Sequence, residues 1–276
     1  METNEARSQW EKAAPGWAKW EDVFTKSAGP ATETMLEMAG VNLGKRILDL
    51  ASGAGSQTLA AAHKVGPTGQ IVANDISKTM LLHVEQNAAS AGISNISTLL
   101  GAVQDLDITP NSFDAVICRF ALMLFAEPAK ALFNVQQALK PEGKIGVVVF
   151  STPQTNLFFV RPMQILLQHA GKTPLPGTPG LFSLGAPGIL EKLFQDTGFI
   201  NIETRILNLT FQMPSANQTL VMVQEAFGAY RAVIGDSPES VQTAAWRDVL
   251  EYFRSIEINN KIEAPAEVLV GSAQKP

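Results

Sequence analysis

The residues with the clearest chemistry surround a small turn, Ala51–Gly55, near the start of the sequence. The apolar run Ile47–Leu50 precedes this turn, and a stretch rich in Ala and Leu follows it. Strand, tight turn and helix in this order build the nucleotide-binding crevice of α/β folds. Gly53 and Gly55 allow a sharp bend and let a ligand come close to the backbone. The unpaired N–H groups at the start of the helix would point into the crevice.

The kind of ligand depends on Asp49 and Thr58, which stand before and after the turn. A dinucleotide fold has the pattern Gly-x-Gly-x-x-Gly, in which the third glycine allows close packing of the helix. Here Thr58 occupies that third position. A carboxylate at Asp49 would repel a pyrophosphate and favour a cation. S-adenosylmethionine fits these residues, because it has no phosphate and carries a sulfonium and an amino group.

A second acid, Asp75, stands at the end of the next predicted strand, 20 residues after Gly55. A carboxylate at this place can accept hydrogen bonds from both ribose hydroxyls. The alternative is a residue that only begins the next helix, near a cap at Ser77. We favour ribose binding, because position and residue type both agree with the rule for this fold. Asp75 does not distinguish NAD from S-adenosylmethionine, since both contain a ribose.

Parallel strands that alternate with helices would bring these residues together. Apolar runs predict strands at 46–50, 70–74, 96–100, 113–118 and 144–150, with helices between them. This alternation over residues 40–150 predicts a doubly wound α/β sheet. Regularity weakens afterwards, with strands expected near 199–211 and 267–271 and helices at 157–170 and 216–233.

These patterns divide the chain into six segments. We expect an N-terminal helical arm or lid at 1–30, the nucleotide-binding core at 31–150, a cap insertion at 151–185, a return to the core at 186–215, a helical cap at 216–258, and the last core strand and tail at 259–276. The two cap segments would cover the end of the sheet at which open α/β folds bind ligands.

The N-terminal segment contains Trp10, Trp17 and Trp20, followed by Phe24. Their spacing places them near one helical face, although Pro15-Gly16 interrupts the pattern. One interpretation is an arm packed on the domain, and the other is a lid that closes on the ligand. A separate helix is expected at 31–40, with Gly40 at its end.

The composition excludes several classes of function. The chain has 276 residues, of which 46% are hydrophobic and 17% charged, so a large core is expected and not global disorder. A net charge of −5 without a long basic run disfavours nucleic acid as a partner. Cys118 is the only cysteine, and no cluster has metal-ligand spacing, so we expect no disulfide and no metal. Neither a signal peptide nor a membrane span is expected, which predicts a cytoplasmic protein.

The order of several motifs resembles that of class I S-adenosylmethionine-dependent methyltransferases, in particular the ubiquinone/menaquinone-methyltransferase-like group that acts on small molecules. The matching segments are ILDLASGAGSQT, VANDISKTML, LLGAVQDLD and NSFDAVICRFALMLFAEPAKALFNVQQALKPEGKIGVVVF. They cover residues 44–150 well, and residues 186–211 and the last strand more loosely. The resemblance implies a Rossmann-like, seven-stranded sheet with an antiparallel last strand and a mainly helical cap.

The resemblance also implies which residues bind the cofactor. They are Asp49, Ala51, Ser52, Gly53 and Gly55 around the methionine moiety, Asp75, Ile76 and Met80 at the ribose and adenine, Ala102, Val103 and Gln104 at the adenine edge, and Cys118 and Arg119 after the fourth strand. Two residues depart from the family pattern. Ala51 replaces the usual first Gly of the turn. Ala102 stands where the family commonly has an Asp that binds the adenine amine, a contact that Gln104 or Asp105 would have to supply.

The implied reaction is an in-line displacement that transfers a methyl group to O, N or C of a small, fairly apolar molecule. It needs proximity, orientation and exclusion of water, and a general base only where the acceptor must lose a proton. His169, in the cap segment, is the candidate base. Arg119 is a candidate for binding the cofactor carboxylate or an anionic substrate. Trp17, Met123 and Tyr230 are candidates for the acceptor pocket, with packing in the core as the alternative.

Two other functions stay open at this point. One is an NAD-linked oxidoreductase, against which Asp49 and Thr58 argue. The other is a protein that binds S-adenosylmethionine without transferring its methyl group, because methyl transfer requires no signature base. The expected partner is a small-molecule methyl acceptor, and a homodimer is compatible with these features.

Overall fold

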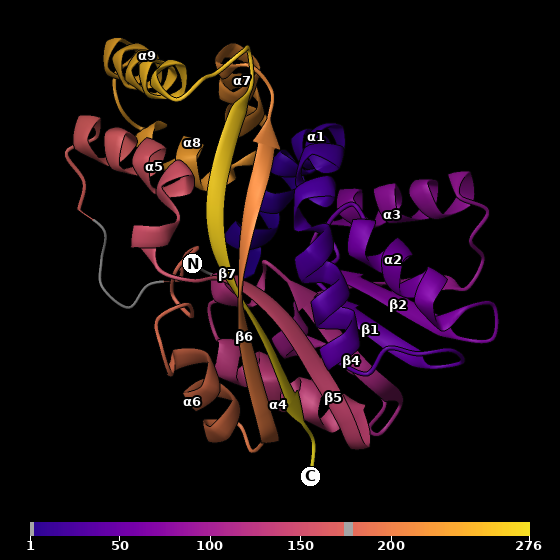
Figure 1. Cartoon of the computed structure of the whole chain (residues 1–276). Helices are drawn as coiled ribbons and strands as arrows, with labels where there is room; N and C mark the ends of the chain where they lie inside the picture. Colours follow the sequence, from indigo (N-terminus) through magenta and orange to yellow (C-terminus); the bar gives the residue numbers. More distant parts are fainter. Residues whose placement is uncertain (1–2, 174–178) are drawn as a thin grey trace.

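A seven-stranded sheet forms the centre of the molecule (Figure 1). In this computed structural model residues 3–173 and 179–276 are described. The strand order is β3-β2-β1-β4-β5-β7-β6, and β7 runs antiparallel to both of its neighbours. The predicted doubly wound sheet with an antiparallel last strand is therefore confirmed. The strands are β1 (Arg46–Leu50), β2 (Gln70–Asp75), β3 (Ile96–Leu100), β4 (Phe113–Arg119), β5 (Leu139–Phe150), β6 (Ile200–Met213) and β7 (Ile262–Gln274).

Helices cover both faces of the sheet. The step from β1 to β2 and the step from β4 to β5 move in opposite directions across the sheet, so right-handed crossovers place their helices on opposite faces. On one face, α1 (Thr3–Met38), α2 (Ser56–Val65) and α3 (Lys78–Ser90) contact one another. On the other, α4 (Pro128–Ala138) contacts α6 (Ile189–Asp196). Three short 3₁₀ helices are η1 (Val103–Asp105), η2 (Leu122–Leu124) and η3 (Pro153–Thr155).

A helical cap stands on an extension of β6 and β7 (Figure 1). The strand β5 pairs with β7 only from Val268 to Gln274, whereas β6 continues along β7 as far as Ile262. This two-stranded extension leads into the cap helices. They are α5 (Leu157–His169), α7 (Ala216–Ala226), α8 (Gly228–Ile234) and α9 (Glu239–Ser255). α5 comes from the first predicted cap segment, and it packs against α8 and α9 from the second.

The N-terminal region is one continuous helix, so the predicted interruption at Pro15-Gly16 and the separate helix at 31–40 are wrong. α1 has 36 residues and contains both Pro15 and Pro30. A proline inside a helix costs about 3 kcal/mol, but α1 contacts the sheet, α2, α3 and the cap helices α7 and α8 along its length. Phe24 and Met35 are among its buried apolar residues. This tertiary packing offsets the local cost of the prolines.

Three other boundaries differ from expectation. The helix predicted at 216–233 is divided at Phe227, whose extended ψ of 83° separates α7 from α8. The last strand begins at Ile262, because the pairing with β6 lengthens it beyond the expected 267–271. β5 begins at Leu139, which pairs with Phe113, so that the residues 141–143 lie within an irregular strand.

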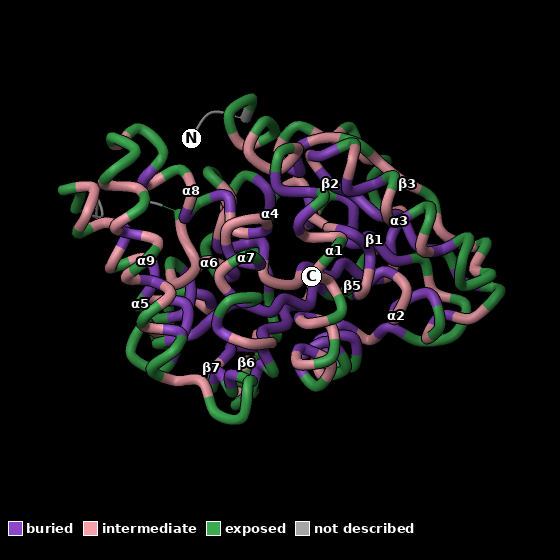
Figure 2. Tube along the Cα trace, turned by 90° about the horizontal axis from the view of Figure 1, so that it is seen from above, coloured by how far each residue is buried: buried purple, intermediate pink, exposed green. Residues whose placement is uncertain are grey.

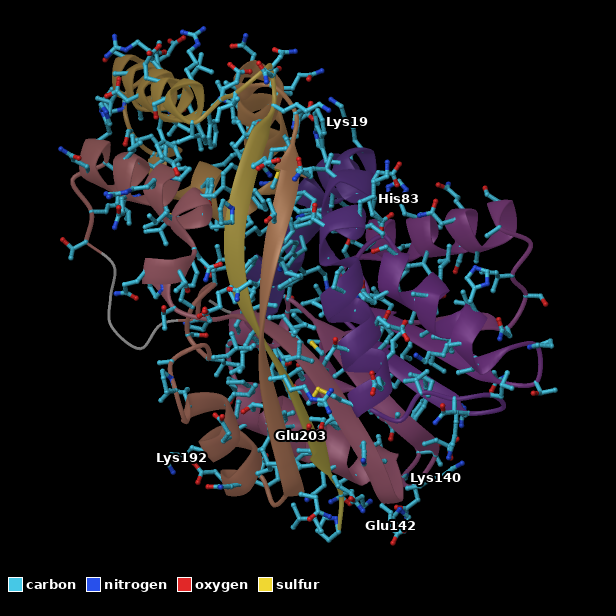
Figure 3. The ribbon with its side chains drawn as sticks, viewed as in Figure 1. Lys19, His83, Lys140, Glu142, Lys192 and Glu203 are labelled. Atoms are coloured by element: carbon cyan, nitrogen blue, oxygen red, sulfur yellow. The ribbon has the colours of Figure 1, made fainter. Side chains whose placement is uncertain are left out.

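Buried residues follow the central strands, whereas the edge strands β3 and β6 are largely exposed or half-buried (Figure 2). Ile47, Ile117 and Val148 in the central strands have no exposed surface. Lys140, Glu142 and Lys192 lie at the end of the sheet that is opposite the cap (Figure 3). The end nearer the cap is the end at which the parallel strands finish.

The close approach of α1 to α7 depends on Gly16. A Cβ atom at this position would lie 2.4 Å from the backbone oxygen of Glu225, whereas a Cβ at Gly29, in the same helix, would meet nothing within 4 Å. We expect Gly16→Ala to lower the free energy of unfolding by about 1–3 kcal/mol through overpacking. Gly29→Ala should raise it by about 0.5–1 kcal/mol through helix propensity. Urea denaturation of the two variants measures both, and equal effects would contradict the packing of α1 on α7.

Candidate functional site

The register of the sheet places the turn after β1 between the ends of β2 and β4. Leu50 is paired with Asn74 of β2, and Asp49 is paired with Ile117 of β4. Asp75 therefore lies one residue beyond the partner of Leu50, and Arg119 two residues beyond the partner of Asp49. Because these strands are parallel, their ends meet at one edge of the sheet. The structure thus brings together the turn, Asp75 and Arg119, as the sequence predicts.

The turn uses left-handed backbone conformations at alternate residues. The φ angles of Ala51, Gly53 and Gly55 are 48°, 57° and 104°. At Gly55 a Cβ would also lie 3.1 Å from the side chain of Val84. The left-handed conformation costs a residue with a Cβ about 1–2 kcal/mol. Ala51 stands where the family pattern has glycine, and it adopts the left-handed conformation at this energetic cost.

Asp75 joins the turn to β2. Its Oδ2 accepts a hydrogen bond from the Gly53 N–H at 3.0 Å, and its Oδ1 accepts one from the Ser77 N–H at 2.9 Å. Burial raises the pKa of Asp75 to about 6. Each carboxylate oxygen can accept a second hydrogen bond. The side chain is therefore held rigidly and keeps acceptor capacity for a ligand.

Asp49 is fully buried beneath the turn and joins β1 to α2. Its Oδ2 accepts a hydrogen bond from the Thr58 hydroxyl at 2.6 Å, and its Oδ1 accepts one from the Gln57 amide at 3.3 Å. Burial raises the pKa of Asp49 to about 7. In the sequence, Thr58 is notable only because it replaces the third glycine of the Gly-x-Gly-x-x-Gly pattern. In the fold it is the hydrogen-bond partner of the acid at the end of β1.

The segment after β3 lies beside the end of β2. The Asn74 side chain donates hydrogen bonds to the backbone oxygens of Leu99 and Gly101, at 2.8 and 2.9 Å. Ala102 and Val103 follow and are buried. Asp105, a candidate to replace the carboxylate missing at Ala102, lies 3.6 Å from Lys130. The remaining predicted residues of this region differ in exposure, with Met80 buried and Ile76 and Gln104 half-buried.

Arg119 extends from the end of β4 toward α1 and α2. Its Nη1 donates a hydrogen bond to the Thr32 hydroxyl at 2.9 Å, and its Nη2 donates one to the Ser56 hydroxyl at 2.6 Å. Burial lowers the pKa of Arg119, and the charges of Asp49 and Glu21 oppose this effect. The preceding residue, Cys118, is buried, and burial raises its thiol pKa to about 12. Cys118 is therefore a packing residue at neutral pH, whereas Arg119 brings a charge to the site.

Two glutamates of α1, which sequence reasoning missed, contact the beginnings of α2 and α3. Glu21 accepts hydrogen bonds from the Ser56 N–H at 2.8 Å and from the Asn87 amide at 3.3 Å. Glu11 accepts hydrogen bonds from the Lys78 N–H at 2.6 Å and from the Thr79 N–H at 3.4 Å. Carboxylates at helix N-termini satisfy unpaired N–H groups and interact favourably with the helix dipole. No local sequence signal identifies them, because their partners come from distant parts of the chain.

The candidates for the acceptor pocket lie in packed surroundings. The Trp17 ring lies 5.6 Å from that of Phe227, and Phe227 lies 5.3 Å from Tyr230. The Tyr230 hydroxyl donates a hydrogen bond to the Phe159 backbone oxygen at 2.6 Å. Met123 is buried in η2. Trp17 and Tyr230 therefore share a neighbour in α1–cap packing, and Met123 belongs to a different part of the core.

His169 lies at the end of α5 and contacts α9. Its Nε2 lies 2.8 Å from the Asp248 Oδ2. The hydrogen bond from His169 lowers the pKa of Asp248. This pair links two helices of the cap and does not by itself place His169 at the turn.

An aromatic cluster that sequence reasoning missed lies at the ends of β4 and β5. Phe120 has a φ of 57°, an uncommon conformation for a bulky residue. Its ring stacks on Phe150 at 4.7 Å, and Phe150 lies 4.6 Å from Phe159 and 6.3 Å from Phe182. The residue that follows Arg119 is thus turned toward apolar rings at the base of the cap.

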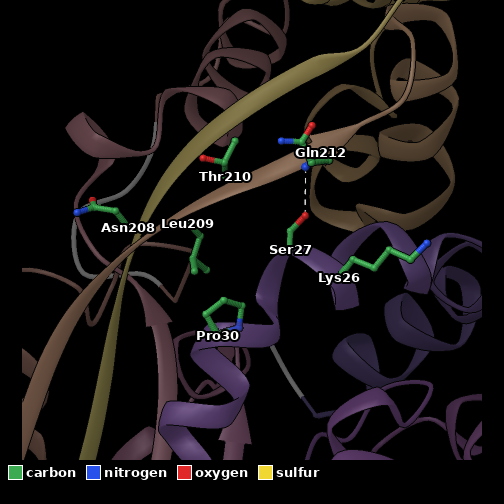
Figure 4. Close-up of a pocket in the computed structure, with 7 residues that line it drawn as sticks. All are labelled: Lys26, Ser27, Pro30, Asn208, Leu209, Thr210 and Gln212. Atoms are coloured by element: carbon green, nitrogen blue, oxygen red, sulfur yellow. Dashed lines mark hydrogen bonds between the residues drawn. The ribbon is translucent and has the colours of Figure 1, made fainter.

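A separate hollow of about 290 Å³ lies between α1 and the edge strand β6 (Figure 4). Lys26, Ser27 and Pro30 line it on one side, and Asn208–Thr210 and Gln212 on the other. The Gln212 N–H donates a hydrogen bond to the Ser27 hydroxyl at 3.1 Å. None of these residues belongs to the turn, β2 or β4.

Two further observations concern the described residues as a whole. Within 3–173 and 179–276, no group of three or more His, Cys, Asp or Glu side chains is arranged to bind a metal ion. In the same part of the chain, no helix has the length and apolar character needed to cross a membrane.

Asp49 should make the stability of the chain depend on pH. Its pKa is about 7 in the folded chain, against an ordinary value of 3.8. The folded state therefore binds the proton more tightly, and this contribution to stability is complete below about pH 4 and lost as pH rises through about 7. Asp49→Asn cannot titrate. We expect the wild type to lose stability relative to the variant as pH rises across this window. The loss should reach up to about 4 kcal/mol, because each unit of pKa difference corresponds to about 1.4 kcal/mol.

Urea denaturation at several pH values measures this difference. Asp196→Asn, at an exposed position of α6, is the matched control and should give no trend. If the difference in unfolding free energy between the wild type and Asp49→Asn does not change with pH, the pKa of the buried Asp49 carboxyl is not raised.

Comparison with known proteins places the first part of the chain in a family. Residues 42–165 match the family model described as a methyltransferase domain. The ubiquinone/menaquinone biosynthesis C-methyltransferase UbiE of Pseudomonas fluorescens is 36% identical over 123 residues, which are 44% of this chain and 48% of that protein. UbiE of Shewanella frigidimarina is 36% identical over 123 residues, 44% of this chain and 49% of the relative. The chain spans about half the length of the curated relatives that it matches.

Solved structures share the fold over a longer part of the chain. The YcgJ protein of Bacillus subtilis superposes with a TM-score of 0.59 at 18% identity, covering 90% of this chain and 98% of that one. A putative methyltransferase of Bacillus halodurans gives 0.59 at 19% identity, covering 89% and 98%. The [4+2]-cyclase SpnF gives 0.56 at 18% identity, covering 96% of each chain.

The order of strands, the antiparallel last strand and the sequence match agree with one another. They confirm the resemblance to class I methyltransferases that the motifs indicate. Residues 42–165 therefore match a methyltransferase domain and part of the UbiE sequences, and the chain shares the class I methyltransferase fold.

Proposed function

We propose that the chain binds S-adenosylmethionine at the edge formed by the turn, β2 and β4, and transfers its methyl group to a small, fairly apolar molecule. The observation that carries this proposal is the pair of hydrogen bonds that Asp75 accepts from the N–H groups of Gly53 and Ser77. They hold an acid with spare acceptor capacity beside a glycine turn, which suits a ribose. The match of residues 42–165 to methyltransferase domains supports the same ligand.

The residues of the site fit a polar ligand. The Ser52 hydroxyl and the Asn74 Oδ1 are buried and have no hydrogen-bond partner in the described part of the chain. Buried polar atoms without partners are costly, at about 1–3 kcal/mol each. A ligand at the turn would relieve this cost for Ser52. Asp49, beneath the turn, disfavours a pyrophosphate and so makes NAD the weaker candidate.

Each part of the site has a proposed task. Asp75 would bind the ribose, and Ala102–Gln104 would border the adenine. The turn Ala51–Gly55 would surround the amino-acid end, and Arg119 would bind its carboxylate. The cofactor supplies a methyl group already activated on a sulfonium. The chain supplies position and exclusion of water, effects that together can be worth about 7–11 kcal/mol.

The aromatic cluster of Phe120, Phe150, Phe159 and Phe182 supports an apolar acceptor. Its first member, Phe120, directly follows Arg119 in the chain, and its ring stacks on Phe150 at the end of β5. The UbiE relatives are C-methyltransferases of ubiquinone/menaquinone biosynthesis. A ring-containing acceptor is therefore the class to test first.

A second candidate function is binding of S-adenosylmethionine without methyl transfer. The observation that favours it is the common fold with SpnF, a [4+2]-cyclase, because the same fold there serves an enzyme that is named for a different reaction. Mass spectrometry separates the two functions, because a methyltransferase adds one methyl group to the acceptor and leaves S-adenosylhomocysteine.

Cofactor binding should depend on Asp75. We expect isothermal titration calorimetry to show binding of S-adenosylhomocysteine, and Asp75→Asn to weaken it about 10- to 100-fold, as loss of charge-assisted hydrogen bonds worth roughly 1.5–3 kcal/mol predicts. Asp196→Asn, far from the turn on α6, is the control and should bind as the wild type does. If the wild type, Asp75→Asn and Asp196→Asn bind S-adenosylhomocysteine with equal affinity, Asp75 does not contribute to the site.

The role of His169 as a general base stays a prediction, restricted to a hydroxyl acceptor. His169→Gln is then expected to lower kcat about 10²- to 10⁴-fold and to leave the affinity for S-adenosylhomocysteine unchanged. Asp248→Asn is the matched control, because it removes the same contact between α5 and α9 and keeps the imidazole. If both variants change only the free energy of unfolding, His169 is a helix contact and not a base.

A further inference from the structure

Ser56, the first residue of α2, lies between two opposite charges. Its N–H donates to the Glu21 carboxylate at 2.8 Å, and its hydroxyl accepts from the Arg119 guanidinium at 2.6 Å. Glu21 comes from α1 and Arg119 from the end of β4. The three residues are far apart in sequence, and the fold brings them together beside the turn Ala51–Gly55.

Neither charge has a direct counter-ion. No salt bridge within 4.0 Å in the described part of the chain involves Glu21 or Arg119. Among the described residues, Glu21 accepts hydrogen bonds from Ser56 and from the Asn87 amide, and Arg119 donates to the hydroxyls of Thr32 and Ser56. Both residues are partly buried, and charges with reduced access to water are normally paired. This region therefore contains a carboxylate and a guanidinium that are held close to each other without contact.

An independent observation points to a ligand at the same place. Ser52, in the turn before α2, is only 2% exposed, and its hydroxyl has no hydrogen-bond partner among the described residues. Thr25 stands one helical turn after Glu21, and its hydroxyl is also buried without a partner. Residues four apart lie on the same face of a helix. Polar groups without partners thus occur on both elements that border Ser56.

The pattern of charge selects the ligand chemistry. A free phosphate would be attracted by Arg119 and by the start of α2, but it would meet the carboxylate of Glu21. A simple amine would meet the guanidinium. A zwitterion satisfies both, because an α-amino acid carries an ammonium and a carboxylate on the same carbon. The Glu21 Oε2 accepts a hydrogen bond from the Asn87 amide, and a carboxylate oxygen can accept a second one.

We propose that Glu21 and Arg119 form one subsite for the zwitterionic amino-acid end of S-adenosylmethionine, in which Glu21 binds the ammonium and Arg119 the carboxylate. The inference rests on the proposed function and deepens it. It makes α1 a part of the cofactor site, through a residue outside every motif of the sequence.

Three ligands test this assignment by calorimetry. S-adenosylmethionine carries an ammonium and a carboxylate beside its sulfonium, decarboxylated S-adenosylmethionine keeps the ammonium and the sulfonium, and 5′-methylthioadenosine carries none of these charges. We expect Glu21→Gln to weaken binding of the first two about 10- to 100-fold and to leave the third unchanged. Arg119→Gln should weaken only S-adenosylmethionine, by a similar factor. Glu21→Asp, which keeps the charge, should retain the preference for ligands with an ammonium.

The controls separate this subsite from other roles. Glu33→Gln changes an exposed acid of the same helix and should alter no affinity. Binding of 5′-methylthioadenosine by Glu21→Gln shows that the variant is folded. Equal weakening of all three ligands would mean that Glu21 only holds α1 in place, and no weakening would remove it from the site; either result overturns the assignment. If the wild type binds none of the three, the proposed function fails, and not only this subsite.

Discussion

The hydrogen bonds that Asp75 accepts from Gly53 and Ser77 are the constraint on which the site depends. One carboxylate fixes the bend after β1 and the beginning of the helix after β2. Asp49, beneath the turn, has a similar role: it accepts hydrogen bonds from Thr58 and Gln57, which join α2 to the end of β1. Both acids are buried, and their burial is tolerated because the backbone and α2 supply donors to them. The geometry of the turn thus comes from side chains on neighbouring strands as much as from its glycines.

The helix α1 connects this edge of the sheet to the cap. Near its end it crosses β5, where a Cβ at Gly146 would meet the Met35 backbone oxygen at 2.8 Å. In its middle, Glu21 contacts the start of α2. The residue directly before it, Trp20, donates its indole N–H to Glu225 of α7 at 2.6 Å. One continuous helix therefore contacts β5, the start of α2 and the cap helix α7.

The parts of the fold that depend on neighbours in sequence could be predicted, and those that depend on distant residues could not. Apolar runs indicate β1 to β4 within a few residues, and the acid after β2 lies where the fold rule places it. The partnership of Asp49 with Thr58 needs the register of α2 on β1. Glu21 and Ser56 meet only because α1 crosses the sheet. The continuity of α1 through Pro15 could not be predicted from the sequence either. Local helix propensity opposes it, and packing against distant elements stabilises it.

The two-stranded extension of β6 and β7 affects how easily the segment between these strands can change during evolution. Met213 and Ile262, the last residues of the extension, are direct partners across the ladder, so the chain leaves and re-enters the scaffold at points about 5 Å apart. Helices α7 to α9 form the whole excursion between them. An excursion with adjacent ends can be replaced by another of different length without disturbing the strands below. The segment with α7, α8 and α9 is therefore a natural unit of exchange, which recombination between relatives, or a designer, could replace while the seven-stranded sheet stays intact.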